Sequence, residues 1–224
     1  MAVLAQTAGL NLVWEAATSV PPNYLGKAQI TAGSAVTVTA LPFGPAQSGR
    51  ALTPADFNYR WTKDGLPLND SSGLGKNQLT YAADAAGRGN TIELSAESPA
   101  NRLSFKQKLV LPVGQPLVLL YEYDPLWGAL YHRTLPPEYF LNKKEISVIA
   151  APYFFNQNAA ATNRLSFNWR LNDENLVVDA AEPDLVTFIR PAGDTQTEYA
   201  VTLNVKNLLN SLQNATTDWR INLN

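Results

Sequence analysis

The chain has 224 residues, of which 46% are hydrophobic and only 16% are charged. An average soluble domain is about 25% charged, and disordered chains and coiled coils carry still more charge, so this composition excludes both and indicates a folded chain with a sizeable core. The net charge of −2 gives no reason to expect nucleic acid or an anionic membrane as a partner, and the absence of cysteine excludes disulfides, cysteine zinc sites, iron–sulfur clusters and thiol nucleophiles.

Apolar and polar residues alternate in several short runs, which is typical of half-buried β-strands. In the first of these runs the alternation places Val36 and Val38 on one face and threonines on the other. The runs are, in chain order, Ala35–Ala40, Thr91–Glu97, Phe105–Leu111 and Tyr199–Val205. Helical patterns are few, and only short turns are expected at Thr53–Asp56 and Lys206–Asn210. No run reaches the roughly 18 apolar residues that a membrane-spanning helix needs, so we predict no membrane span within this chain.

The second half of the chain repeats the first. Tyr59 and Trp61 correspond to Phe167 and Trp169, each 108 positions later. Three further segments match in the same order at offsets of 107 to 110: Leu12–Glu15 with Leu119–Glu122, Val36–Phe43 with Ile146–Tyr153, and Ile92–Ala96 with Val201–Val205. Such steady offsets predict two copies of one module of about 108 residues.

We therefore predict two β-sandwich domains, residues 1–112 and 116–224. The joint between them, Leu111–Pro116, contains two prolines and one glycine and should be short and stiff. In each domain a tryptophan in mid-strand and an aromatic residue two positions earlier should anchor the core, which assigns Trp61 and Tyr59 to one core and Trp169 and Phe167 to the other.

Turn chemistry follows each of these tryptophans. Asp64–Gly65 comes three residues after Trp61 and predicts a tight hairpin, because glycine adopts a positive φ without steric cost. Asn172–Asn175 forms the matching turn-prone segment after Trp169.

The segment Tyr59–Leu68 resembles the region from strand C to strand C′ of immunoglobulin-like and PKD-type domains. Leu12–Glu15, Pro21–Ala28 and Ala40–Phe43 resemble tandem immunoglobulin-like modules in predicted exported proteins of candidate-phylum bacteria. The resemblance implies an all-β chain of two tandem immunoglobulin-like β-sandwich domains with an extracellular or cell-surface location. The export signal and the anchor would then lie outside this chain. The resemblance supplies no catalytic residues, and the cysteine pair of antibody domains is missing.

Catalytic arrangements are poorly supported by the sequence. His132 is the only histidine, the first copy has no histidine at the matching place, and no Gly-x-Ser-x-Gly segment occurs. Glu122 and Asp124 share a strand face, but Glu15 is the repeat mate of Glu122, which favours a structural duty. That duty would be an ion pair of Glu122 with Arg133, matched by Glu15 with Lys27 in the first copy. We predict that the chain is not an enzyme.

Metal and cofactor sites are also not expected. Five acidic residues cluster in the second copy, without the spacing of an EF-hand loop: Asp173, Glu174, Asp179, Glu182 and Asp184. A solvated turn accounts for them better than a calcium site, which stays open as the weaker alternative. We predict no metal and no cofactor.

An aromatic-rich stretch, Tyr121–His132, leaves two interpretations open. Its rings either cover one end of the second sandwich or pack on the first module, or they stack on sugar rings as in carbohydrate-binding sandwiches. The presence of Trp14 and Tyr24 at similar places in the first copy favours the structural interpretation. If a ligand binds here, the candidate residues are Trp127, Tyr123 and Tyr131.

The sequence thus predicts a non-enzymatic, exported cell-surface module that spaces or adheres, as a repeat within an envelope or pilus-associated assembly. Its partners would be a protein or neighbouring surface modules. The alternative is a carbohydrate-binding module with a glycan ligand, and an enzyme or enzyme-accessory domain is the least favoured class.

Overall fold

The computed structural model describes residues 7–85, 87–190 and 198–223. The chain is nearly all β, as predicted, and it divides into two compact units. The first unit contains the described residues up to Ala17 together with Lys27–Gly114. The second contains Thr18–Gly26 and the described residues from Gln115 onward. The domain boundaries 1–112 and 116–224 stay a prediction. They place Thr18–Gly26 in the first domain, whereas this segment is part of the second compact unit.

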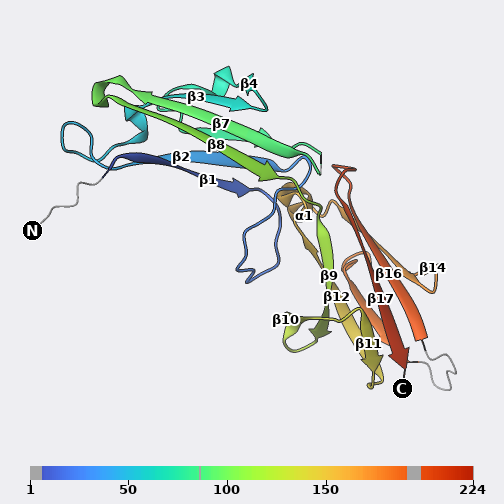
Figure 1. The fold of residues 1–224 in the computed structure, drawn as a ribbon. Coiled ribbons are helices and arrows are strands. Elements are labelled where there is room, and N and C mark those ends of the chain that lie inside the picture. The colour runs from blue at the N-terminus through green and yellow to red at the C-terminus, as the bar shows by residue number, and fades with distance from the viewer. Residues whose placement is uncertain (1–6, 86, 191–197, 224) are drawn as a thin grey trace, which may run out of the picture. The chain divides into compact units, whose positions relative to one another are not determined.

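The first unit consists of two antiparallel sheets that enclose one core (Figure 1). One sheet has the strand order β1-β2-β6, with β1 at Gly9–Ala16, β2 at Ala35–Phe43 and β6 at Gln78–Ala82. The other has the order β4-β3-β7-β8, with β4 at Leu66–Pro67, β3 at Asn58–Lys63, β7 at Gly89–Ser98 and β8 at Leu103–Pro112, and the short β5, Gly73–Leu74, also pairs with β3. Single 3₁₀ turns connect strands at Pro54–Asp56, Asn69–Ser71 and Pro99–Asn101.

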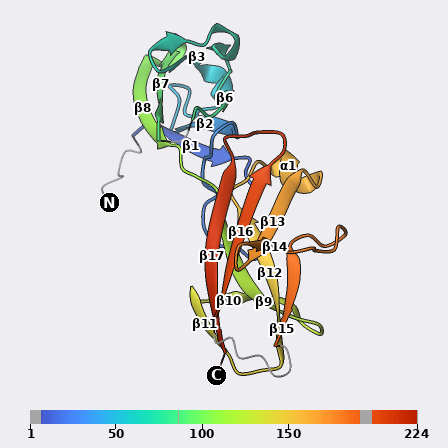
Figure 2. The same ribbon diagram turned by 90° about the vertical axis from the view of Figure 1, so that its right-hand side faces the viewer.

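The second unit has the same plan (Figure 2). One sheet has the order β10-β9-β12-β15, with β10 at Gly128–Thr134, β9 at Leu117–Asp124, β12 at Glu145–Tyr153 and β15 at Leu185–Ile189. The other has the order β11-β17-β16-β13-β14, with β11 at Glu138–Leu141, β17 at Asn214–Leu223, β16 at Glu198–Asn207, β13 at Leu165–Leu171 and β14 at Glu174–Asn175. The short helix α1, Gln157–Ala161, joins β12 to β13. β11 pairs parallel with β17, whereas the other pairings between these strands, as far as the described residues show, are antiparallel.

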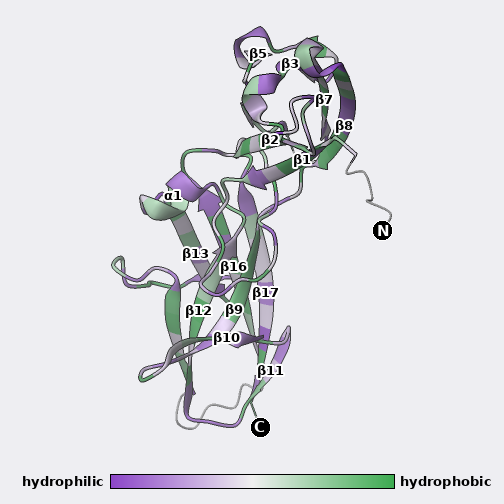
Figure 3. Cartoon of the chain, turned by 90° about the vertical axis from the view of Figure 1, so that its left-hand side faces the viewer, coloured by the Kyte–Doolittle hydropathy of each residue, from purple (hydrophilic) through white to green (hydrophobic). Residues whose placement is uncertain are grey.

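Each core is built from the inward residues of alternating strands, and the alternation is visible in the hydropathy of the strands (Figure 3). Val36 and Val38 are fully buried on β2, and threonines occupy the intervening positions. Trp61 is 1% exposed on β3, and Trp169 is equally buried on β13. Tyr59 is fully buried beside Trp61, whereas Phe167 is only half-buried against the second core.

The repeat extends to individual hydrogen bonds. The indole Nε1 of Trp61 donates to the Lys76 carbonyl at 3.0 Å, and Nε1 of Trp169 donates to the Pro183 carbonyl at the same distance. The carbonyl of each tryptophan accepts from the backbone N–H seven residues later, at 2.9 Å in both units. Each tryptophan is therefore tied to the connecting segments of its own sandwich as well as to the core.

The two hairpin turns also match. Asp64 and Gly65 have φ values of 51° and 80°, and Asn172 and Asp173 have 48° and 70°, so both turns place two consecutive residues in the left-handed region. The side-chain Oδ1 of Asp64 accepts from the Thr91 N–H at 2.8 Å. That of Asn172 accepts from the equivalent N–H in the second unit at 2.9 Å.

None of the described helices is long and apolar enough to cross a membrane.

Candidate binding surface on the second unit

An aromatic cluster, defined as Tyr24, Tyr121, Tyr131, Tyr153 and Phe154, lies on the second unit. Three of its members come from the adjacent strands β9, β10 and β12, and Tyr24 comes from the Thr18–Gly26 segment. The rings meet edge to face, with centroid separations from 5.1 to 5.9 Å. Edge-to-face contacts stabilise aromatic pairs because the positive ring edge meets the negative ring face.

Main-chain hydrogen bonds hold the Thr18–Gly26 segment against the end of β12. The N–H of Ser19 donates to the Phe155 carbonyl, and the N–H of Phe154 donates to the Ser19 carbonyl, each at 2.7 Å. The hydroxyl of Ser19 donates to the same Phe155 carbonyl at 3.2 Å. Phe154 has φ of 63°, a rare value for an aromatic residue, and its ring packs on Tyr24. The segment therefore presents Tyr24 to the cluster in a fixed position.

A surface cavity of about 470 Å³ opens at this cluster. Tyr24, Tyr131, Tyr153 and the exposed His132 line it. Burial raises the pKa of the Tyr131 hydroxyl. Burial, and secondly a 2.6 Å hydrogen bond with Tyr121, raise the pKa of the Tyr153 hydroxyl. Both phenols are therefore neutral at physiological pH. The Tyr131 hydroxyl can donate, whereas the Tyr153 hydroxyl is engaged with Tyr121.

The turn between β9 and β10 carries two highly exposed apolar side chains. Leu126 is 89% exposed and Trp127 is 81% exposed. The Oδ1 atom of Asp124 accepts hydrogen bonds from both of their backbone N–H groups, at 2.8 and 3.1 Å, and Gly128 completes the turn with φ of 74°. The side chains thus project from a hydrogen-bonded turn that leads directly into cavity-lining residues of β10.

The structure distributes the three predicted ligand residues over this region. Tyr131 lines the cavity, with its ring at 70° to that of Tyr121. The side chain of Trp127 is exposed in the turn, and Tyr123 is half-buried on β9 opposite Ala129. Sequence reasoning missed Tyr24 and Tyr153 as cavity residues, because nothing in the order of residues shows which strands and loops become neighbours.

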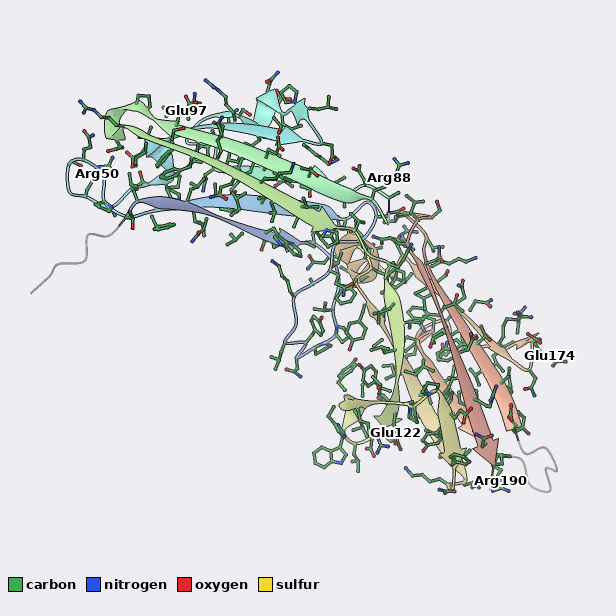
Figure 4. The ribbon with its side chains drawn as sticks, viewed as in Figure 1. Arg50, Arg88, Glu97, Glu122, Glu174 and Arg190 are labelled. Atoms are coloured by element: carbon green, nitrogen blue, oxygen red, sulfur yellow. The ribbon has the colours of Figure 1, made fainter. Side chains whose placement is uncertain are left out.

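The prediction that Glu122 pairs with Arg133, and Glu15 with Lys27, is wrong. Glu122, labelled in Figure 4, accepts a hydrogen bond from Lys143 at 2.8 Å rather than pairing with Arg133. This contact raises the pKa of the Lys143 ammonium group. In the first unit, the ammonium of Lys27 lies 3.4 Å from the ring centre of Trp14, so it makes a cation–π contact with the indole.

The acidic residues of the second copy are spread along a surface connection. The Oδ1 atom of Asp179 accepts from the Ala181 N–H at 2.8 Å, as in a local turn. Within residues 7–85, 87–190 and 198–223, no three His, Cys, Asp or Glu side chains are placed to hold a metal ion together.

No family model matches the chain, and no curated protein matches it. Among solved structures, it is similar to three N-terminal domains of the outer capsid protein Hoc of bacteriophage RB49, with 13% identity and a TM-score of 0.48 over 97% of this chain and 59% of that one. It is also similar to the fibronectin(III)-like modules of CbhA from Clostridium thermocellum, with 11% identity and a TM-score of 0.28 over 92% and 93% of the chains. The Ig1-2 module of the Drosophila receptor protein tyrosine phosphatase DLAR gives 9% identity and a TM-score of 0.29 over 96% and 98%.

These structural neighbours are tandem immunoglobulin-like and fibronectin(III)-like domains. The chain spans about three fifths of the Hoc fragment that it matches.

Proposed function

We propose that this chain is a non-enzymatic module that acts outside the cell, as a spacer or protein-contact repeat of a surface assembly such as an envelope or a pilus. The observation that carries the proposal is the pair of exposed apolar side chains, Leu126 and Trp127, on a hydrogen-bonded turn. Large apolar side chains grouped on a surface mark contact sites, since their exposure to water is unfavourable. The resemblance of the repeat to modules of exported proteins supports the location.

The contact would work through a small number of anchors. Tryptophan is the residue most often found at the energetic centre of protein interfaces, because it buries a large area with few rotatable bonds. Trp127 has its backbone fixed by Asp124, which lowers the entropy lost when a partner covers it. A partner that covers Leu126 and Trp127 together would complete an apolar contact of which only one half is present here.

Carbohydrate binding is the second candidate, and the cavity at the aromatic cluster favours it. Tyr24, Tyr131 and Tyr153 place three phenol rings around a space of about 470 Å³, and the exposed indole of Trp127 lies in the turn two residues before the cavity-lining Ala129. Neutral phenol hydroxyls can donate to sugar hydroxyls, and the indole face can stack on a pyranose ring. The edge-to-face ring geometry supports a pocket for one sugar unit rather than a flat platform for a chain.

One pair of variants tests both candidates, because Leu126 and Trp127 are neighbours with similar exposure and only one carries a ring. Trp127→Ala and Leu126→Ala would be compared with the unchanged chain on a glycan array and in pull-downs from surface-protein extracts. Protein contact predicts that both variants lose at least about tenfold in affinity for the captured partner. Sugar binding predicts a loss with Trp127→Ala alone. Retained affinity in both variants would refute a function for this turn.

The location has its own test. In cells of the source organism, an antibody against the second unit should label the outer surface, and added protease should remove the label without cell lysis. A protein protected from protease until lysis would contradict the surface role, whatever the outcome for Trp127.

A further inference from the structure

Strand β15 forms one edge of its sheet (Figure 2), and on its outer side the N–H of Leu185 donates to the Glu182 carbonyl at 3.1 Å. The N–H of Arg190 donates to the Lys144 carbonyl at 2.9 Å, and the N–H of Ala150 donates to the Asp184 carbonyl at 2.8 Å. Hydrogen-bonded positions alternate along an antiparallel pair, so the even-numbered residues 184 to 190 face β12. The odd-numbered residues point their N–H and C=O groups away from the sheet.

Among the described residues, the outer side of β15 is apolar. Sheet edges in natural proteins usually carry a lysine, a proline or a bulge that prevents pairing with another chain. β15 has the sequence Leu-Val-Thr-Phe-Ile, with none of these, and Ile189 is 59% exposed. An apolar cavity of about 350 Å³ runs along the strand, and the fully exposed Val177 lies on its rim.

The residues of β15 are complementary to a second copy of the same strand. If two copies pair antiparallel about Thr187, the two Thr187 residues face each other and Leu185 faces Ile189. These are the positions whose backbone groups point outward, so the main-chain hydrogen bonds of Thr187 and Ile189 fall in register, and the N–H of Leu185 exchanges the Glu182 carbonyl for that of Ile189 in the second copy. One residue further out, Asp184 of each copy lies opposite Arg190 of the other, an opposite-charge pair at both ends (Arg190 is labelled in Figure 4).

The matching edge of the first unit differs. There β6 presents Gln78, Thr80 and Ala82 at the outward positions, because its register with β2 follows the same alternation. Apart from the threonine that both edges share, these residues offer only the methyl group of Ala82 in place of the two large aliphatic side chains of Leu185 and Ile189. The edge of the second unit is therefore the one suited to burial.

We propose that β15 pairs antiparallel with β15 of a second copy of this chain, with the two-fold axis at Thr187. The pairing joins two four-stranded sheets into one continuous sheet. Such an interface is isologous, since each residue meets its own symmetry mate, and it closes at the dimer. The contact removes Ile189 and Val177 of each copy from water. The salt bridges at the ends of the strand fix the register. This inference does not depend on the proposed function.

Two proline variants distinguish a loss of pairing at the edge of β15 from a loss of folding. Thr187→Pro removes one outward N–H and leaves the main-chain hydrogen bonds to β12 intact, a placement that edge strands tolerate. Thr80→Pro is the matched control on β6, since each threonine hydroxyl contacts a hydroxyl on the next strand, at 2.8 and 3.0 Å. In sedimentation equilibrium, the unchanged chain and Thr80→Pro should dimerise with equal constants, and Thr187→Pro should weaken dimerisation at least about tenfold. A monomeric unchanged chain would overturn the proposal.

Charge reversal tests the register without altering the backbone. Asp184→Arg makes both ends of the strand positive, and Arg190→Asp makes both ends negative, so each variant alone should remain monomeric. Mixed in equal amounts, the two should form heterodimers, and the double variant Asp184→Arg/Arg190→Asp should recover self-association. A mixture that stays monomeric, or single variants that dimerise like the unchanged chain, would overturn the pairing about Thr187.

Discussion

At the scale of single residues, equivalent positions of the two copies show which side chains the same site in the fold accepts. Tyr59 is fully buried on β3, and its hydroxyl has no hydrogen-bond partner among the described residues. Its repeat mate is Phe167, which has no hydroxyl to satisfy. An unsatisfied buried hydroxyl is unfavourable, because it loses its water contacts without replacement.

Tyr59→Phe should therefore raise the free energy of unfolding by about 1 kcal/mol, measured by urea denaturation. Tyr153→Phe is the control in the opposite direction, since the Tyr153 hydroxyl bonds to that of Tyr121 at 2.6 Å and its removal should destabilise the chain. A lower stability of Tyr59→Phe would mean that its hydroxyl has a partner in solution.

Burial also predicts the response to alkaline pH. Desolvation raises the pKa of Tyr59 and that of Tyr81 to about 12, from an ordinary value of 10.0. The unfolded chain therefore loses these protons first as the pH rises, and the stability that neutral tyrosine provides is complete below pH 10 and falls between pH 10 and 12. Denaturation at pH 9 and pH 11 should show this decrease, and Tyr59→Phe should reduce it. A pH-independent midpoint over this range would contradict the burial of both rings.

At the scale of elements, the hairpin turns show how two sequences satisfy one backbone. The second residue of each turn has a positive φ, and it is Gly65 in the first unit and Asp173 in the second. Nothing lies within 4 Å of a Cβ placed on Gly65, so a side chain there would meet only backbone strain. Left-handed backbone costs a non-glycine residue about 1 kcal/mol or more.

Asp173→Gly should consequently stabilise the second hairpin, by up to about 1 kcal/mol, and Gly65→Ala should destabilise the first by a similar amount. Urea denaturation of both variants measures the effect. The ion pair that Asp173 makes with Arg170, at 3.6 Å and largely exposed, is too weak to offset the gain. Equal stability of all three chains would show that the turns adapt their backbone to the residue present.

Some elements had no signal in the sequence. The strands with alternating patterns and the 3₁₀ turn at Pro54–Asp56 could be predicted from periodicity and from proline. The aromatic-rich stretch was not predicted to form the β9–β10 hairpin, because aromatic residues on both faces hide the alternation. The short helix α1 and the parallel pairing of β11 with β17 depend on contacts between distant parts of the chain.

At the scale of the whole chain, the connections between elements determine which residues belong to each unit, and the repeat alone does not. Thr18–Gly26 lies between β1 and β2 in the sequence, yet it is part of the second unit and supplies Tyr24 to the aromatic cluster. The predicted second domain, 116–224, does not contain this segment. It would leave the faces of Tyr153 and Phe154 that Tyr24 contacts open to water.

The isolated fragment 116–224 should therefore fold but bind the dye ANS more strongly than the complete chain does, because the uncovered rings form an apolar patch. Circular dichroism checks the fold of the fragment, and Tyr24→Ala in the complete chain should reproduce part of the increase in dye fluorescence. A fragment that binds no more dye than the complete chain would show that Tyr24 does not shield the cluster.

The sequence by itself determined the fold class, the repeat and the buried tryptophans, since strand alternation, turn chemistry and large aromatic residues act over a few neighbouring positions. Only the tertiary structure decided that Tyr24 joins Tyr153 and Phe154, that Glu122 meets Lys143, and that β15 lies at the edge of its sheet. These features depend on which strands and loops come together across more than 20 residues of chain, and local patterns carry no information about such distant pairings.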